Sequence, residues 1–193
     1  MTASREEIRG WLRDGNVGLE ARRTTMKVSG FEDLKVLVDT GALWSESEAG
    51  NQFIGLVLYP AKGVGMDRVR LAAHLLVKDT ILNGWRQVEV QSLSNIMDMI
   101  QNGEGFWKAA LRKYNAVVIM DFYDHGIEGK PFTEEMQYKV QNAILQAIDH
   151  GVGITTVATK PLVLEDAKSW HWYTRDFLKI IHGRNISVGI QNV

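Results

Sequence analysis

Five short apolar runs, rich in β-branched residues, constrain the fold of this chain more than any other feature. The runs lie at 53–59, 88–90, 116–122, 153–159 and 186–190. Segments of helical period separate them, at 68–83, 92–101 with 105–114, 133–150 and 164–182. Strands alternating with helices form right-handed βαβ units, and wholly apolar strands are typical of parallel sheets buried on both faces. The sequence therefore predicts a three-layer α/β domain with a five-stranded parallel sheet.

Length, cysteine content and charge narrow the class of protein. A chain of 193 residues is long enough for one compact domain that buries roughly 70% of its unfolded surface. The absence of cysteine excludes disulfide scaffolds, thiolate metal sites and cysteine nucleophiles. The net charge of -1 gives no global basic field, so any contact with DNA would have to be local.

The hydropathy pattern bears on location. The sequence contains no run near the roughly 20 apolar residues that span a bilayer, and its N-terminus lacks the apolar centre of a secretory signal. We therefore expect a cytoplasmic protein without membrane contact.

The N-terminal segment predicts a helical appendage, residues 1–30, ahead of an α/β domain at 31–193. Ser4 and Glu7 have the spacing of a capping box, and a stripe of three apolar residues follows: Ile8, Trp11 and Leu12. Residues 16–30 are polar and suggest a linker or an arm on the body, and 31–48 predicts a second helix. The stripe has two readings that we weigh equally: docking a partner, or packing on its own domain.

The positions of the prolines indicate where a ligand would bind. Pro60, Pro131 and Pro161 all follow predicted strands, in connections to helices. In open α/β sheets ligands bind at the carboxyl ends of the strands. The loops at 60–67, 121–132 and 159–164 are therefore the candidate site.

The first of these loops contains glycines between a buried strand and a helix, which permits a nest of backbone N–H groups for phosphate. A full phosphate loop, G-x-x-x-x-G-K-[ST], also needs a lysine and a hydroxyl. Met66 and Asp67 follow Gly65 instead, and the aspartate would repel an anion. Two interpretations stay open: a turn without ligand, or phosphate binding through Lys62 and Arg68.

Asp121 follows the third predicted strand, where a carboxylate can hold a metal ion. Its neighbour is Phe122, where a nucleotide hydrolase would have a second acid. Asp124 and His125 come next and allow a separate metal-dependent hydrolase site, although Asp121 could equally cap a turn. No G-x-S-x-G or H-E-x-x-H motif supports a triad hydrolase or a zinc enzyme.

The order of these features resembles the AAA+ domain of DnaC/IstB-type helicase loaders and transposition ATPases, over roughly residues 22–190. The resemblance lies in an arginine-containing segment before a phenylalanine, a strand ending in an aromatic residue, proline and G-x-G, an L-A-A helix, an S-x-x-x-I-M segment, a strand ending in aspartate, and a final I-I-H-G helix.

The resemblance implies roles for particular positions. Gly63, Gly65, Met66 and Asp67 match the end of the Walker A motif with its lysine and threonine replaced, and Arg68 is a candidate for the lysine's space. Asp121 matches the Walker B carboxylate. Two further pairs lie near functional positions of the family: Thr159 and Lys160 near sensor 1, and Arg175 and Lys179 near the arginine finger at subunit contacts.

Because several independent positions of the site are replaced, we expect a degenerate AAA+-like protein that does not hydrolyse ATP and needs no cofactor. The resemblance implies protein–protein contact in DNA replication, with a replicative helicase, a helicase loader or a second copy as partner, and a phage or mobile-element origin. The alternative is a working ATPase that holds ATP and magnesium through an atypical loop, with these residues: Lys62, Gly63, Gly65, Arg68, Asp121 and Lys160.

Overall fold

The computed structural model describes residues 3–39, 55–84, 87–102, 116–120, 133–159 and 175–191. Its five strands are β1 (Gly55–Pro60), β2 (Val88–Ser92), β3 (Ala116–Met120), β4 (Gly153–Val157) and β5 (Asn185–Ile190). They pair in parallel throughout, in the order β2-β3-β4-β1-β5. The predicted five-stranded parallel sheet is confirmed.

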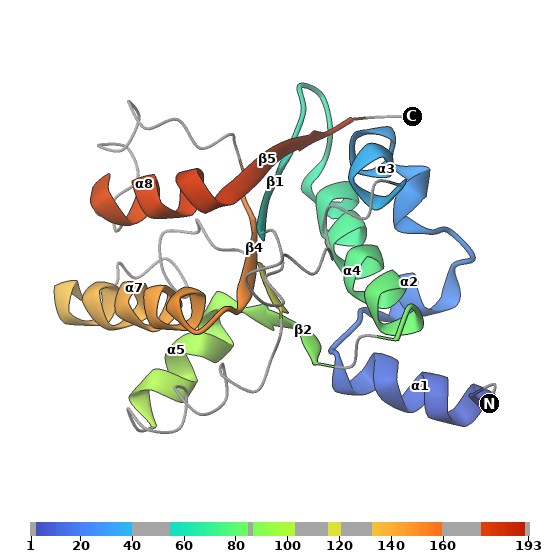
Figure 1. Cartoon of the computed structure of the whole chain (residues 1–193), viewed down its shortest axis with the longest axis horizontal. Helices are drawn as coiled ribbons and strands as arrows, with labels where there is room; N and C mark the ends of the chain where they lie inside the picture. The colour runs from blue at the N-terminus through green and yellow to red at the C-terminus, as the bar shows by residue number, and fades with distance from the viewer. Residues whose placement is uncertain are drawn as a thin grey trace.

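Helices cover both faces of this sheet. The helices of the described residues are α1 (Arg5–Asp14), α2 (Leu19–Arg23), the short 3-10 helix η1 (Val28–Gly30), α3 (Glu32–Asp39), α4 (Met66–Leu82), α5 (Leu93–Gln101), α7 (Glu134–Asp149) and α8 (Arg175–Arg184). Figure 1 shows α1 to α4 on one side of the sheet and α5, α7 and α8 on the other. The predicted three-layer arrangement, with helices on both faces of the sheet, is confirmed (Figure 1).

The two faces of the sheet belong to two separate hydrophobic clusters, because successive side chains of a strand point to opposite faces. In β1, Leu56 and Leu58 pack in the cluster under α4, whereas Val57 packs in the cluster under α5, α7 and α8. All three side chains are fully buried. This burial on both faces explains why the strand sequence is apolar throughout rather than alternating.

The segment predicted as a linker or an arm on the body carries two short helices and packs onto the domain, which corresponds to the arm. Val17, Ala21 and Val28 are each at most 2% exposed and belong to the cluster under α4. The segment therefore shares its core with the rest of the domain. Hydropathy alone missed this, because single buried residues are spread among many charged ones.

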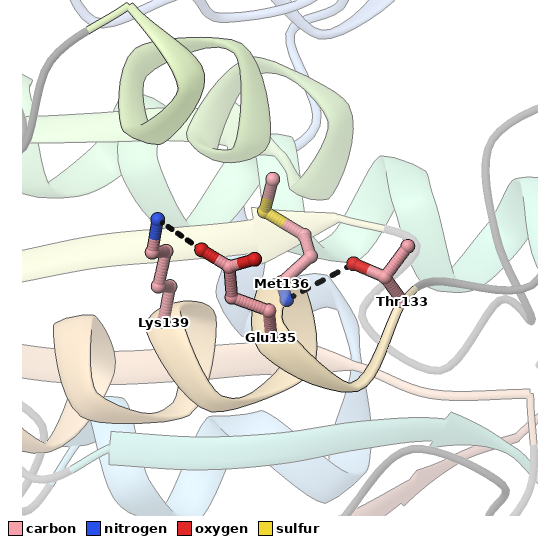
Figure 2. A network of polar contacts seen from close by, with 4 residues as sticks. All are labelled: Thr133, Glu135, Met136 and Lys139. Carbon is pink, nitrogen blue, oxygen red and sulfur yellow. Dashed lines mark hydrogen bonds and ion pairs between the residues drawn. The ribbon is translucent and has the colours of Figure 1, made fainter.

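The helix caps follow their sequence signals. At α1 the Glu7 N–H donates to Ser4 Oγ at 3.2 Å and the Ser4 N–H donates to Glu7 Oε2 at 2.7 Å, the predicted capping box. Thr133 caps α7 by accepting from the Met136 N–H at 3.3 Å. Figure 2 shows this cap beside the exposed ion pair between Glu135 and Lys139.

The centre of the sheet has one close backbone approach. The Asn185 side chain donates from Nδ2 to the Ile154 carbonyl at 2.9 Å, so it reaches across β1 from β5 to β4. Gly55 lies where this side chain passes, and a Cβ there would overlap both partners. The glycine therefore permits a bridge between the strands on either side of β1.

The helices in the described ranges include none that is long and apolar enough to cross a membrane.

Candidate functional site

The strand order places a change in the direction of the connections between β1 and β4. The helix after β1, α4, covers one face, whereas α8, which follows β4 along the chain, covers the other. Adjacent strands whose connections diverge in this way form a topological switch point, where α/β proteins bind ligands at the carboxyl ends. The loop from β1 to α4 therefore lies at the position that the fold favours for a site.

The backbone of this loop forms a tight turn held to the neighbouring strand. The Ala61 N–H donates to the Ile190 carbonyl at 2.9 Å, and the Val64 N–H donates to the Ala61 carbonyl at 3.0 Å. Gly63 has a φ of 82°, in the left-handed region that favours glycine. Gly65 is the N-cap of α4, and no side chain caps this helix within the described residues.

Open space surrounds the two loop glycines. A Cβ at Gly63 or at Gly65 would have no described atom within 4 Å. Lys62 beside them is exposed. A helix N-terminus without a side-chain cap directs free backbone N–H groups and a partial positive charge outward. The backbone thus keeps the form of an anion cradle.

The side chains at the start of α4 do not complete that cradle. Met66 is half-buried and packs against the core under α4. Asp67 is fully exposed and lies 3.6 Å from Arg70 one turn along the helix. The first turn therefore offers a thioether and a carboxylate, neither of which attracts a phosphate.

The Arg68 side chain contacts Gln191, just after β5, and the ring of Phe31. Its Nε donates to the Gln191 carbonyl at 2.8 Å, and its guanidinium carbon lies 5.0 Å from the centroid of the Phe31 ring. The Gln191 N–H in turn donates to Asp33 Oδ2 at 3.2 Å. Arg68 thus connects α4 to the residue after β5 and to Phe31 before α3, while its Nη2 has no hydrogen-bond partner among the described residues. The described side chains at the start of α4 therefore do not include the lysine and hydroxyl of a full phosphate loop.

Several of the remaining candidate site residues lie outside the part of the chain that the structure describes. Asp121 and Lys160 lie outside the described residues, as do Asp124 and His125. Among the residues that the structure does describe, no three histidine, aspartate or glutamate side chains gather in a way that could hold a metal ion. The metal and Walker B hypotheses stay predictions.

The two candidates for subunit contact lie on α8. Arg175 is the first residue of that helix. Lys179 is 53% exposed and pairs with Asp176 at 3.6 Å. Exposed pairs of this kind contribute little to stability, so Lys179 can reach a partner at small cost. Its role between subunits stays a prediction.

The apolar stripe of α1 faces the chain's own domain. Leu12 is 5% exposed, and Ile8 and Trp11 pack against the cluster under α4. Of the two readings that the sequence left open, this contact corresponds to packing on the domain. Docking of a partner on the stripe stays a prediction, and it would require α1 to share or release these contacts.

Polar side chains of α4 hold the N-terminal segment, which sequence reasoning missed. Lys78 Nζ donates to the Thr24 carbonyl at 2.7 Å, and Asp79 Oδ2 accepts from the Val28 N–H at 2.7 Å. Burial raises the pKa of the Asp79 carboxyl, although the bond from Val28 and two lysines oppose this. The sequence signal that could have revealed this contact is Lys78, a lysine that directly follows a run of mostly apolar residues on the helix.

His74 completes this attachment one turn earlier on α4. Its Nδ1 accepts from the Gly18 N–H at 3.1 Å, which requires the imidazole to be neutral with its proton on Nε2. Burial lowers the pKa of His74 below its usual value of 6.5. The burial and the hydrogen bond therefore favour the same, uncharged state.

Solved structures match this fold, whereas sequence comparison does not identify relatives. A DnaC helicase loader matches with a TM-score of 0.55 at 14% identity, over 92% of this chain and 98% of that chain. DnaA bound to AMPPCP and single-stranded DNA matches with a TM-score of 0.58 at 11% identity, over 92% and 51%. No family model and no curated protein matches the sequence.

These matches establish the fold. The chain has the α/β fold of the P-loop AAA+ proteins. A second DnaA structure, from Aquifex aeolicus and bound to AMPPCP, has a TM-score of 0.52 at 10% identity and covers 82% of this chain and 44% of that one. The chain spans about half the length of the two DnaA structures.

Proposed function

We propose that this protein is a degenerate, non-hydrolysing AAA+-like protein of the helicase-loader type, which acts through protein–protein contacts in DNA replication. The likeness to the DnaC helicase loader supports the proposal, because it extends over almost the full length of both chains. Likeness of fold does not imply activity, so the argument about hydrolysis rests on the side chains of the site.

One observation carries the loss of hydrolysis: the first turn of α4 presents Met66 and Asp67, while Arg68 is held by Gln191 and Phe31. Phosphoryl transfer depends on positive charge that neutralises and positions the phosphates. The exposed Asp67 carboxylate at the helix N-terminus has the opposite effect, since it adds negative charge where phosphate would bind. The loop therefore lacks the charge that the reaction needs.

Phosphate release tests this part of the proposal. With ATP and magnesium in excess, the full chain should release phosphate no faster than the buffer, with or without a purified replicative helicase. Magnesium-dependent release that disappears in an Asp121→Ala variant would overturn the proposal and favour the working ATPase.

The partner is the second part of the proposal. We infer that it is a replicative helicase or a helicase loader, since the DnaC neighbour is described as a helicase loader. Co-elution of the purified chain with each purified candidate, read with the mass of the complex in solution, tests this. A strictly monomeric chain that binds neither would contradict the partner assignment while leaving the fold intact.

Nucleotide binding without hydrolysis is the second candidate function. The open backbone around Gly63 and Gly65 favours it, as does the AMPPCP bound to both DnaA structures. In this case Lys62 and the first backbone N–H groups of α4 would contact phosphate, with Asp121 on magnesium. Calorimetry with ATP, described at the end of the Discussion, separates this candidate from the first.

A further inference from the structure

A second site lies at the other end of the sheet from β5, on the edge strand β2. It is an open pocket of about 340 Å³. The lining residues that the structure describes come from the connection after α1, from β2 and from α5 with its C-cap: Asn16, Gln91, Asn95, Asp98, Met99 and Asn102. Two strands, β3 and β4, separate β2 from β1, so the pocket is distinct from the loop at the start of α4.

A backbone hydrogen bond to the edge strand β2 fixes the turn that carries Asn16. The Val90 N–H donates to the Gly15 carbonyl at 3.0 Å, so the chain after α1 covers part of the free edge of β2. Asn16 follows with a φ of 52°, and its Nδ2 donates to Glu89 Oε1 around that edge. The turn therefore presents the Asn16 amide to the pocket in a defined orientation.

The described polar groups of the pocket are four carboxamides, which both donate and accept, and the Asp98 carboxylate, which only accepts. A carboxylate only accepts, so the bond to Glu89 uses an N–H of Asn16 and leaves Oδ1 as the acceptor. Gln91 is only 9% exposed, and its carboxamide has no hydrogen-bond partner among the described residues. The Gln91 carboxamide is therefore available to a group that enters the pocket.

The charge of the pocket is negative. Asp98 lies in its wall, and Glu89 is buried behind Asn16. α5 ends at Gln101 without a basic residue in its last turn, so the negative end of its dipole is not compensated from within the helix. The lining residues that the structure describes include no lysine, arginine or histidine. A phosphate or a nucleic-acid backbone would be repelled, whereas a cation would be attracted.

We propose that this pocket binds the guanidinium group of an arginine side chain on a partner protein. A guanidinium offers five N–H donors in one plane, which suits several acceptors spread over a pocket wall, whereas an ammonium is a compact and strongly hydrated charge. Met99 supplies an apolar surface for the methylene stem. The site does not depend on nucleotide binding, so it can hold even where the account of the β1–α4 loop fails.

Binding of small probes to the isotopically labelled full chain tests the chemistry. N-acetyl-arginine-methylamide should shift the side-chain amide NMR signals of Gln91 and its neighbours in a saturable way. The citrulline analogue has the same shape without the charge and should bind at least about tenfold more weakly. Equal binding of the two, or no saturable shift, would overturn the proposal.

Variants localise the effect. Asp98→Asn removes the charge with little change of shape and should weaken the arginine probe by about tenfold or more. Glu134→Gln makes the same change of charge on the exposed first turn of α7 and should leave the affinity unchanged. Equal losses in the two variants would reduce the binding to overall charge and refute a site.

The source of the cation is tested separately. Agmatine carries the same guanidinium without a peptide backbone. Binding of agmatine about tenfold tighter than the peptide-like probe would assign the pocket to a free amine and overturn the assignment to a partner protein. Comparable or weaker binding of agmatine supports an arginine in a chain.

Discussion

The glycines of two regions behave differently. Gly15 and Gly55, which we call the framework glycines, lie where neighbouring atoms leave no room for a side chain. Gly63 and Gly65, the loop glycines between β1 and α4, lie in open space. Packing thus requires glycine in the framework, whereas in the loop only Gly63 has a conformation that favours it.

The framework glycines therefore maintain the packing of the fold, whereas the loop glycines lie where a ligand could make contact. The framework around β1 is closed to change, and it preserves the AAA+ architecture. The loop keeps an accessible backbone but carries Met66 and Asp67 in place of the side chains that hold phosphate. Under the proposed function, the positions that would abolish hydrolysis are therefore Met66 and Asp67 in the first turn of α4, outside the framework.

The largest effect should come from Gly55→Ala. The new Cβ would overlap the Ile154 carbonyl oxygen and the Asn185 amide, and backbone in the middle of a sheet cannot move aside. We expect a loss of about 3 kcal/mol in the free energy of unfolding, measured by denaturant titration. Gly65→Ala is the control in the loop and should cost about 1 kcal/mol or less. Equal losses would remove the distinction between the two regions.

Gly15→Ala should have a smaller effect on the same scale. Its Cβ would lie 2.6 Å from the terminal methyl of Ile81, which can move, and 3.1 Å from the Val88 carbonyl, which cannot. We expect a loss of about 2 kcal/mol and faster hydrogen exchange of the Val90 amide, which donates to Gly15. Unchanged exchange at Val90 would show that the turn does not depend on a glycine.

The pH dependence of stability should show a third, smaller effect through His74. Its pKa is lowered in the folded chain, so the unfolded chain binds more protons as the pH falls below 6.5. The contribution of His74 is therefore fully present above that pH and is lost progressively below it, by at most about 1.4 kcal/mol per pH unit. Urea titrations of the wild type and of His74→Gln measure it.

The two proteins should differ in slope. The unfolding free energy of the wild type should fall more steeply than that of His74→Gln between about pH 7 and pH 5. Parallel profiles would mean that His74 accepts a proton in the folded state as readily as in the unfolded one, and that its bond from Gly18 does not restrain the N-terminal segment.

The sequence predicted the sheet well because most of its strands are buried on both faces, and it predicted the start of α1 because the capping box has a short signature. The Ser4 capping box and the limits of β1 are local features of that kind. The predicted start of α4 at residue 68 was two residues late, since Met66 and Asp67 have no helical signal of their own. The short helices within residues 16–30 were not predicted, because this segment is held by tertiary contacts with His74, Lys78 and Asp79 rather than by a local signal.

The site was less predictable than the fold. The replacement of the Walker A side chains is visible in the sequence, but the direction of Arg68 is not, because Gln191 lies more than a hundred residues away along the chain. The pocket on β2 was missed for the same reason. Asn16, Gln91 and Asp98 have no common spacing, and only the packing of α1 and α5 beside one strand brings them together.

Calorimetry of ATP with magnesium, on the wild type and on the double variant Met66→Lys, Asp67→Thr, tests the central claim most directly. The variant restores the lysine and the hydroxyl on an otherwise unchanged loop. The account predicts no measurable binding to the wild type up to about millimolar ATP and a gain of at least about a hundredfold in affinity for the variant. Micromolar binding to the wild type, lost in Asp121→Ala, would contradict it.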